Sequence, residues 1–164
     1  MKSRWKAVAV ALALTGVAAG SAEAQTSEMH FGPQVIFNFD SSDFGIGAQF
    51  SAPIAHYLEF YPSFNLFFPD VGSAFAVNAD LKYRFTGQGW NWLYAGTGLN
   101  VTHASVDVGT TSVSSTRGHL NLFGGVESLR GRIHPFGELR LVLIKGSTVQ
   151  VAGGVNITLG THHR

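Results

Sequence analysis

Residues 74–85 read Ala-Phe-Ala-Val-Asn-Ala-Asp-Leu-Lys-Tyr-Arg-Phe, and the alternation in this stretch decides the fold class. From Phe75 to Phe85 every second residue is apolar. The positions between them include Asn78, Asp80, Lys82 and Arg84. A period of two residues is that of a β-strand with one apolar and one polar face. Helical periodicity is missing after residue 24, so the sequence predicts an all-β protein.

The same alternation recurs in eight segments that turn-forming residues separate. We expect strands over residues 30–39, 44–52, 58–67, 74–85, 92–102, 118–127, 135–143 and 149–159. These segments are longer than the strands of soluble proteins, which most often have about 5–6 residues. They approach the roughly 9–11 residues that a tilted strand needs to cross a bilayer. The longest connection is a polar loop expected over residues 103–117. Pro62, inside the third segment, removes a ladder hydrogen bond and marks either a bulge or a wrong register in the predicted strand.

The direction of the alternation decides which face meets water. No Asp, Glu, Lys or Arg falls on the apolar face of any segment. The opposite faces carry small and amide residues and a few charges of both signs: Glu59, Asp80, Lys82, Arg84, Glu127, Glu138 and Arg140. A water-facing sheet with so few charges would tend to associate. Inside a narrow eight-stranded barrel, by contrast, opposite charges can pair and fill the space.

We therefore expect a closed, eight-stranded, antiparallel up-and-down transmembrane β-barrel whose apolar face meets lipid. The charged residues just named form its lumen polar network, a packed interior that plugs the barrel rather than a conduction path. Aromatic residues near the segment ends predict two interfacial girdles. One contains Phe39, Phe44, Phe67 and Phe68, and the other Tyr57, Tyr83, Phe85 and Trp90. The alternative is a soluble periplasmic, lipocalin-like binder with the apolar face turned inward around a ligand.

Length and composition agree with one exported domain. The chain has 164 residues, no cysteine, 20 glycines, 13% charged residues and a net charge of +1. This length allows one core. The lack of cysteine excludes a disulfide scaffold, a thiol nucleophile and a Cys-ligated zinc. Without a basic field we expect no nucleic-acid partner.

The first 24 residues have the organisation of a secretory signal peptide. Lys2, Arg4 and Lys6 precede an apolar run over residues 7–20, and Ala22-Glu23-Ala24 supplies a small-residue cleavage site. The apolar run is shorter than the roughly 20 residues of a membrane-spanning helix, which argues against an anchor. We expect residues 1–24 to be cleaved, which leaves residues 25–164 as the barrel.

On these features the chain resembles the small eight-stranded outer-membrane barrels of Gram-negative bacteria, of the OmpA/OmpX type. The resemblance rests on the signal, on residues 58–64 (Leu-Glu-Phe-Tyr-Pro-Ser-Phe), on the strand Phe75–Phe85 and on residues 153–159 (Gly-Gly-Val-Asn-Ile-Thr-Leu). It implies an outer-membrane, porin-like monomer with both termini on the periplasmic side and a structural or surface-interaction role. It also implies contact with outer-membrane lipid and lipopolysaccharide, and insertion by the barrel assembly machinery. Family members usually end on an aromatic residue, whereas this sequence ends Leu-Gly-Thr-His-His-Arg.

One short motif could carry catalysis. His103 and Ser105 are similar to the His-x-Ser pair of lipid A deacylases, which are also eight-stranded outer-membrane barrels. A serine becomes nucleophilic beside an imidazole that a carboxylate orients, but only Asp107 is near in sequence. We expect no catalysis, and a lipid A-modifying enzyme is the alternative. His162 and His163 make at most a weak metal site, so we expect neither a metal nor a cofactor.

Overall fold

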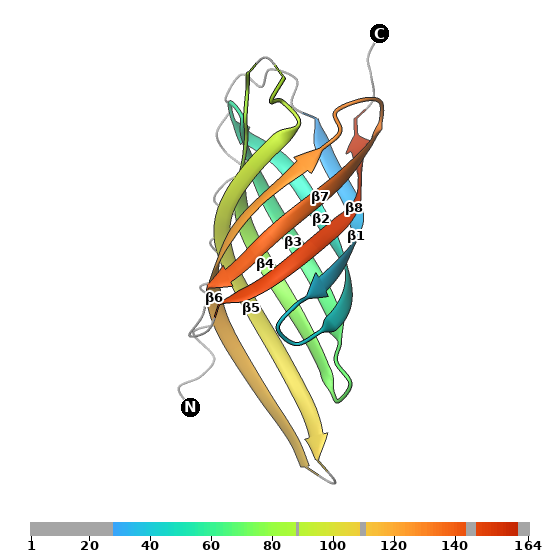
Figure 1. Ribbon diagram of the computed structural model, residues 1–164, viewed down its shortest axis with the longest axis vertical. Helices are drawn as coiled ribbons and strands as arrows, with labels where there is room; N and C mark the ends of the chain where they lie inside the picture. The colour runs from blue at the N-terminus through green and yellow to red at the C-terminus, as the bar shows by residue number, and fades with distance from the viewer. Residues whose placement is uncertain (1–27, 88, 109–110, 144–146, 161–164) are drawn as a thin grey trace.

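The computed structural model describes residues 28–87, 89–108, 111–143 and 147–160, and every regular element within these ranges is a β-strand (Figure 1). None of the described residues forms a helix that is long and apolar enough to cross a membrane. The predicted signal peptide, residues 1–24, lies outside the described ranges, as do His162 and His163.

Eight antiparallel strands follow one another around a closed barrel, and β1 pairs with β8 to complete it. The strands are β1 (Met29–Asn38), β2 (Asp43–Ala55), β3 (Leu58–Phe68), β4 (Ser73–Arg84), β5 (Leu93–Val108), β6 (Thr111–Glu127), β7 (Ile133–Leu143) and β8 (Thr148–Leu159). This confirms the predicted fold class. We call the end where β1 begins and β8 ends the terminal end. The opposite end, where β5 joins β6, is the hairpin end.

The exterior of the barrel is apolar. Side chains at alternate positions of every strand point outward and stay exposed, such as Leu99 at 61%, Ile133 at 59% and Leu139 at 52%. Exposed apolar residues also include Phe31, Val35, Ile46, Phe64, Val77, Leu81, Leu122, Val151 and Ile157. A surface this apolar is the lipid-facing surface of a transmembrane barrel. The lipocalin-like interpretation, which turns this face inward, is therefore wrong.

The predicted loop over residues 103–117 is also wrong. β5 and β6 pair without interruption from Leu93 and Val126 to Val108 and Thr111, so this region is a β-hairpin. The hairpin extends beyond the other strands at the hairpin end (Figure 1). It was missed because both of its faces are rich in Ser and Thr. The alternation of hydrophobicity ends at the membrane boundary although the hydrogen-bonded ladder continues.

Aromatic residues lie exposed at both ends of the barrel. Phe39, Phe44 and Phe68 are exposed at the hairpin end, and Tyr57, Tyr83, Phe85 and Trp90 at the terminal end. Phe67 was predicted among them but is buried inside the barrel. Strand alternation gives the reason, since Phe67 shares its face with the inward-pointing Glu59 and Tyr61.

Pro62 does not shift the strand register. It pairs with Ala79 in an unbroken β3–β4 ladder. On the β2 side, the pairs Gln49–Ser63 and Ala52–Phe60 keep one register, and the residue pairs between them are missing. The bulge lies instead between Pro53 and Ala55. The proline is thus accommodated by a short gap in one ladder.

Candidate functional site

The interior contains a cluster of four charged side chains toward the terminal end, which we call the Lys82 cluster. The Lys82 ammonium lies 2.7 Å from a Glu127 oxygen and 3.5 Å from a Glu59 oxygen. The Arg84 guanidinium contacts the same two carboxylates, Glu59 at 3.0 Å and Glu127 at 3.1 Å. Lys82 and Glu127 side chains are completely buried. Burying charges costs several kcal/mol per ion unless each is paired, as these are.

Further hydrogen bonds complete the coordination of both carboxylates. The Ser51 hydroxyl donates to Glu59, and the Asn156 amide donates to Glu127 at 2.8 Å. The cluster therefore joins side chains from β2, β3, β4, β6 and β8.

A second charged cluster, the Arg140 cluster, lies beside the first. Arg140 contacts an Asp80 oxygen at 2.6 Å and a Glu138 oxygen at 2.9 Å. The Tyr94 hydroxyl donates to Glu138 at 3.2 Å, and the Asn121 amide donates to Asp80 at 3.0 Å. The two clusters contain all of the charged residues that the sequence pattern assigned to the lumen. Each of these side chains has a partner of opposite charge.

Three aromatic rings pack between the two clusters. Tyr61, Tyr94 and Phe123 are buried and contact one another. The Lys82 ammonium lies 4.4 Å from the Tyr94 ring centre and 4.7 Å from that of Tyr61. Because a cation over an aromatic face is attracted to the ring, these contacts add to the ion pairs.

Amide side chains fill the interior next to the charged clusters. The Asn78 oxygen accepts hydrogen bonds from Asn100 at 2.7 Å and from Asn121 at 2.9 Å, while its amide donates to Ser63. Gln34 and Asn65 form another pair at 2.7 Å. The alternation placed the three asparagines on inward faces, but pairing them across strands requires the register.

Close packing in this region depends on glycine. A β-carbon added at Gly98 would lie 2.2 Å from an Asp80 carboxylate oxygen and 2.4 Å from the Ala79 carbonyl oxygen. No real β-carbon approaches backbone oxygen so closely. Gly98 therefore allows Asp80 to reach Arg140 inside a narrow barrel.

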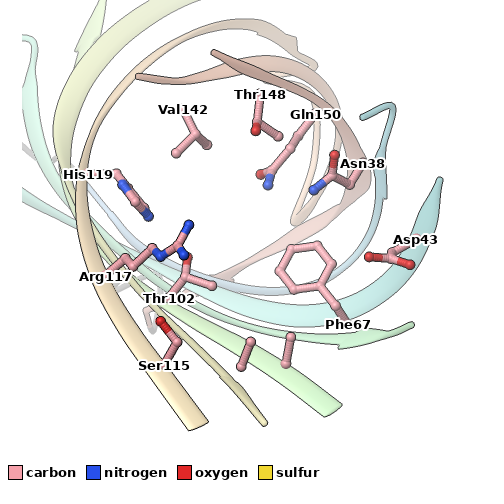
Figure 2. A pocket seen from close by; sticks show the side chains of 12 residues that line it. Asn38, Asp43, Phe67, Thr102, Ser115, Arg117, His119, Val142, Thr148 and Gln150 are labelled. Atoms are coloured by element: carbon pink, nitrogen blue, oxygen red, sulfur yellow. The ribbon is translucent and has the colours of Figure 1, made fainter. Parts of the chain in front are cut away.

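A cavity of about 360 Å³ opens toward the hairpin end, and we call it the outer cavity (Figure 2). Its lining residues are Asn38, Asp43, Phe67, Ala74, Thr102, Ala104, Ser115, Arg117, His119, Val142, Thr148 and Gln150. Figure 2 shows Arg117 and His119 on one wall, with Asn38 and Gln150 across the cavity from them. The sequence interpretation missed this cavity, because it placed Arg117 in a loop. Arg117 faces the interior because it follows the alternation of β6, in which Leu120 points outward and His119 points inward.

The His-x-Ser motif lies on the outward face of the extended hairpin. His103 contacts the Thr116 hydroxyl through Nδ1 at 2.8 Å, and its ring packs on Phe75. The Ser105 hydroxyl is 3.1 Å from the Ser73 hydroxyl. Each member of the pair thus has its own partner on a neighbouring strand. Within the described part of the chain, no group of three metal-ligating side chains lies close enough to hold an ion.

A scan against protein-family models finds no match to this sequence. A search of curated proteins finds none either. Solved structures do match. The N-terminal β-barrel domain of Pseudomonas aeruginosa OprF superposes with a TM-score of 0.69 at 12% identity, covering 80% of this chain and 97% of that domain.

Two more structures superpose over 80% of this chain. Neisserial surface protein A (NspA) gives a TM-score of 0.61 at 16% identity and is covered to 95%. Ail, the attachment invasion locus protein of Yersinia pestis, solved with the heparin analogue sucrose octasulfate, gives 0.55 at 12% identity and is covered to 97%. The chain therefore has the fold of the small eight-stranded outer-membrane β-barrels. Its apolar exterior is the surface that this location requires.

Proposed function

We propose that this outer-membrane β-barrel is a monomeric, non-conducting and non-catalytic protein that presents its hairpin end at the cell surface. Its role is then structural or in surface interaction. Outer-membrane lipid and lipopolysaccharide cover the exterior, and the barrel assembly machinery inserts the chain.

The packed interior is the observation that carries this proposal. The largest fully buried side chains are Tyr61, Tyr94, Lys82, Glu127, Asn78, Asn121, Asn156, Asp80 and Ser51. They come from six of the eight strands, β2, β3, β4, β5, β6 and β8, and meet across the interior of the barrel. Eight-stranded barrels have an interior just wide enough to be filled by side chains. A lumen filled and ion-paired in this way leaves no continuous aqueous path.

The even number of strands brings both ends of the barrel chain to the same side of the membrane. Both ends of the barrel chain lie at the terminal end, which we place on the periplasmic side. The extended β5–β6 hairpin then projects outward, where long connections of such barrels are expected. Two of the structurally similar proteins are described as a surface protein and an attachment invasion protein, which supports a surface role.

The lack of cysteine makes the orientation testable in living cells. In one variant, Ser114→Cys, the thiol lies on the hairpin. In the control, Arg130→Cys, it lies on the exposed turn between β6 and β7 at the terminal end. A membrane-impermeant maleimide should label the first variant on intact cells. It should label the second only after the outer membrane is permeabilised, and the reverse pattern would refute the orientation.

Conductance tests the plugged lumen. Purified protein in a planar bilayer should give no discrete current steps, whereas a large general porin measured in the same cell gives them. Reproducible steps from the unmodified protein would refute the plug. For the catalytic alternative, Ser105→Ala should leave the lipid A mass spectrum unchanged, and a change that depends on Ser105 would establish an enzyme.

A further inference from the structure

We propose that the outer cavity is a binding site for a small hydroxylated anion, of the sugar acid or sugar phosphate class. This inference goes beyond the proposed function by naming a ligand. It rests on that function only for the side of the outer membrane from which the ligand enters.

The unpaired state of Arg117 is the first observation. Lys82, Arg84 and Arg140, the other interior-facing cations of the described residues, all have carboxylate partners within 4.0 Å. Arg117 also lines the interior, where it stays exposed to solvent, and no described carboxylate lies within ion-pair distance of it. It points into an open cavity beside His119 (Figure 2). A guanidinium presents a planar set of donors that matches a carboxylate or a phosphate, so the missing partner is supplied from solution.

The walls around Arg117 are the second observation. Thr102 and Ser115 bring hydroxyl groups to its side of the cavity, and Asn38 and Gln150 bring amides to the other side (Figure 2). Hydroxyl and amide groups both donate and accept hydrogen bonds, which suits a ligand that carries several hydroxyl groups. A ligand that matches the whole cavity therefore carries one anionic group and several hydroxyl groups.

The apolar lining and the volume of the cavity are the third observation. Phe67 lines the cavity and also belongs to a buried apolar cluster with Ile36, Ala76 and Ala152. Phe67 therefore gives the cavity an apolar wall that continues into this buried cluster. A cavity of about 360 Å³ lies within the range of small-molecule sites, which combine apolar walls with a few placed polar groups.

The charge of Asp43 limits the ligand further. Asp43 lines the cavity away from Arg117, beyond Phe67 in the view of Figure 2. A polyanion that filled the cavity would bring negative charge near this carboxylate, and like charges in a confined site repel. The cavity should therefore prefer a ligand whose single anionic group lies at the Arg117 wall.

Calorimetric titration of the protein, purified from outer membranes in detergent micelles, tests the proposal. The probes are glucuronate, glucose 6-phosphate and neutral glucose. We expect saturable 1:1 binding of at least one acidic probe, with glucose at least tenfold weaker. The tighter of the two acidic probes shows whether the site selects a carboxylate or a phosphate.

Two variants locate the binding. Arg117→Gln should weaken binding of the acidic probe at least tenfold, because hydrogen bonds to charged groups are strong. Arg132→Gln, on the exposed turn at the terminal end, removes the same charge and should leave affinity unchanged. Retention of the heat-dependent gel shift shows that both variants are folded. The proposal is overturned if neither acid binds, if glucose binds equally well, or if the two variants behave alike. A failed titration leaves the cysteine-labelling result intact, so the two proposals fail separately.

Discussion

Replacing Lys82 by methionine should show most directly how much the buried ion pairs of the interior contribute to the free energy of unfolding. The substitution keeps the length of the side chain but removes the cation that lies 2.7 Å from Glu127 and 3.5 Å from Glu59. Breaking a buried ion pair by removing one partner typically costs about 3–5 kcal/mol. Glu127 keeps Arg84 at 3.1 Å and Asn156 at 2.8 Å, which places the expected loss near about 3 kcal/mol.

A second variant separates the charge effect from lost packing. In the native protein, the Lys82 and Arg140 clusters together contain four carboxylates and three cations, which leaves an excess of one negative charge. Lys82→Met raises this excess to two negative charges. Adding Glu127→Gln returns the excess to one. The double variant should therefore be more stable than the sum of the two single losses predicts, by at least about 1 kcal/mol.

The assay is equilibrium urea unfolding in lipid vesicles, followed by tryptophan fluorescence. Arg130→Met, at an exposed turn, removes the same charge outside the interior and should change stability by less than about 0.5 kcal/mol. A loss of less than about 1 kcal/mol for Lys82→Met would contradict the expected cost of the unpaired charge, and so would a double variant that loses the sum of the two single losses.

Three further predictions follow from the packing and the exterior. The unheated protein should migrate differently from the boiled protein on an SDS gel, because the closed barrel resists detergent; identical mobility would contradict closure. Gly98→Ala should abolish or strongly reduce this shift, because the added β-carbon would collide with Asp80. Gly118→Ala should preserve the shift, because the atom nearest to its added β-carbon is 4.0 Å away. Leu139→Arg should lower the free energy of unfolding in vesicles by about 2–4 kcal/mol, because it places a charge against lipid near mid-strand. Ser114→Arg on the extended hairpin should have almost no effect, and equal losses would refute the lipid-facing assignment.

The exterior and the charged interior could be predicted from the sequence because one physical rule covers both. Each residue of a membrane-spanning strand faces either lipid or lumen, so the period of two sorts Leu81 outward and Lys82 inward without any knowledge of partners. For Phe67, this alternation predicts the position of the side chain better than the tendency of aromatic residues to lie at strand ends. Its place in the alternation put it inside, although its place near the rim suggested a girdle.

The hairpin and the outer cavity could not be predicted in the same way. Beyond the membrane boundary both faces of a strand meet water, so Ser105, Ser114 and Thr116 carry no alternation of hydrophobicity. Arg117 faces the interior because β6 keeps its alternation before Gly118, where the predicted strand began, and this continuation is visible only in the unbroken ladder with β5. Partners across the interior are equally hidden, since the Glu127–Lys82 pair links β6 to β4.

The position of Asn156 has a consequence for how the barrel is made. This one side chain on the last strand donates to Glu127 and accepts from Gln49 of β2. Its strand also forms the ladder that joins the end of the chain to its beginning. Until that ladder forms, Glu127 has Lys82 and Arg84 but lacks the Asn156 donor, and water has access to the charges around it. The sheet therefore closes and the interior excludes water in the same step of assembly. A partly assembled barrel has no part of its charged interior sealed from water.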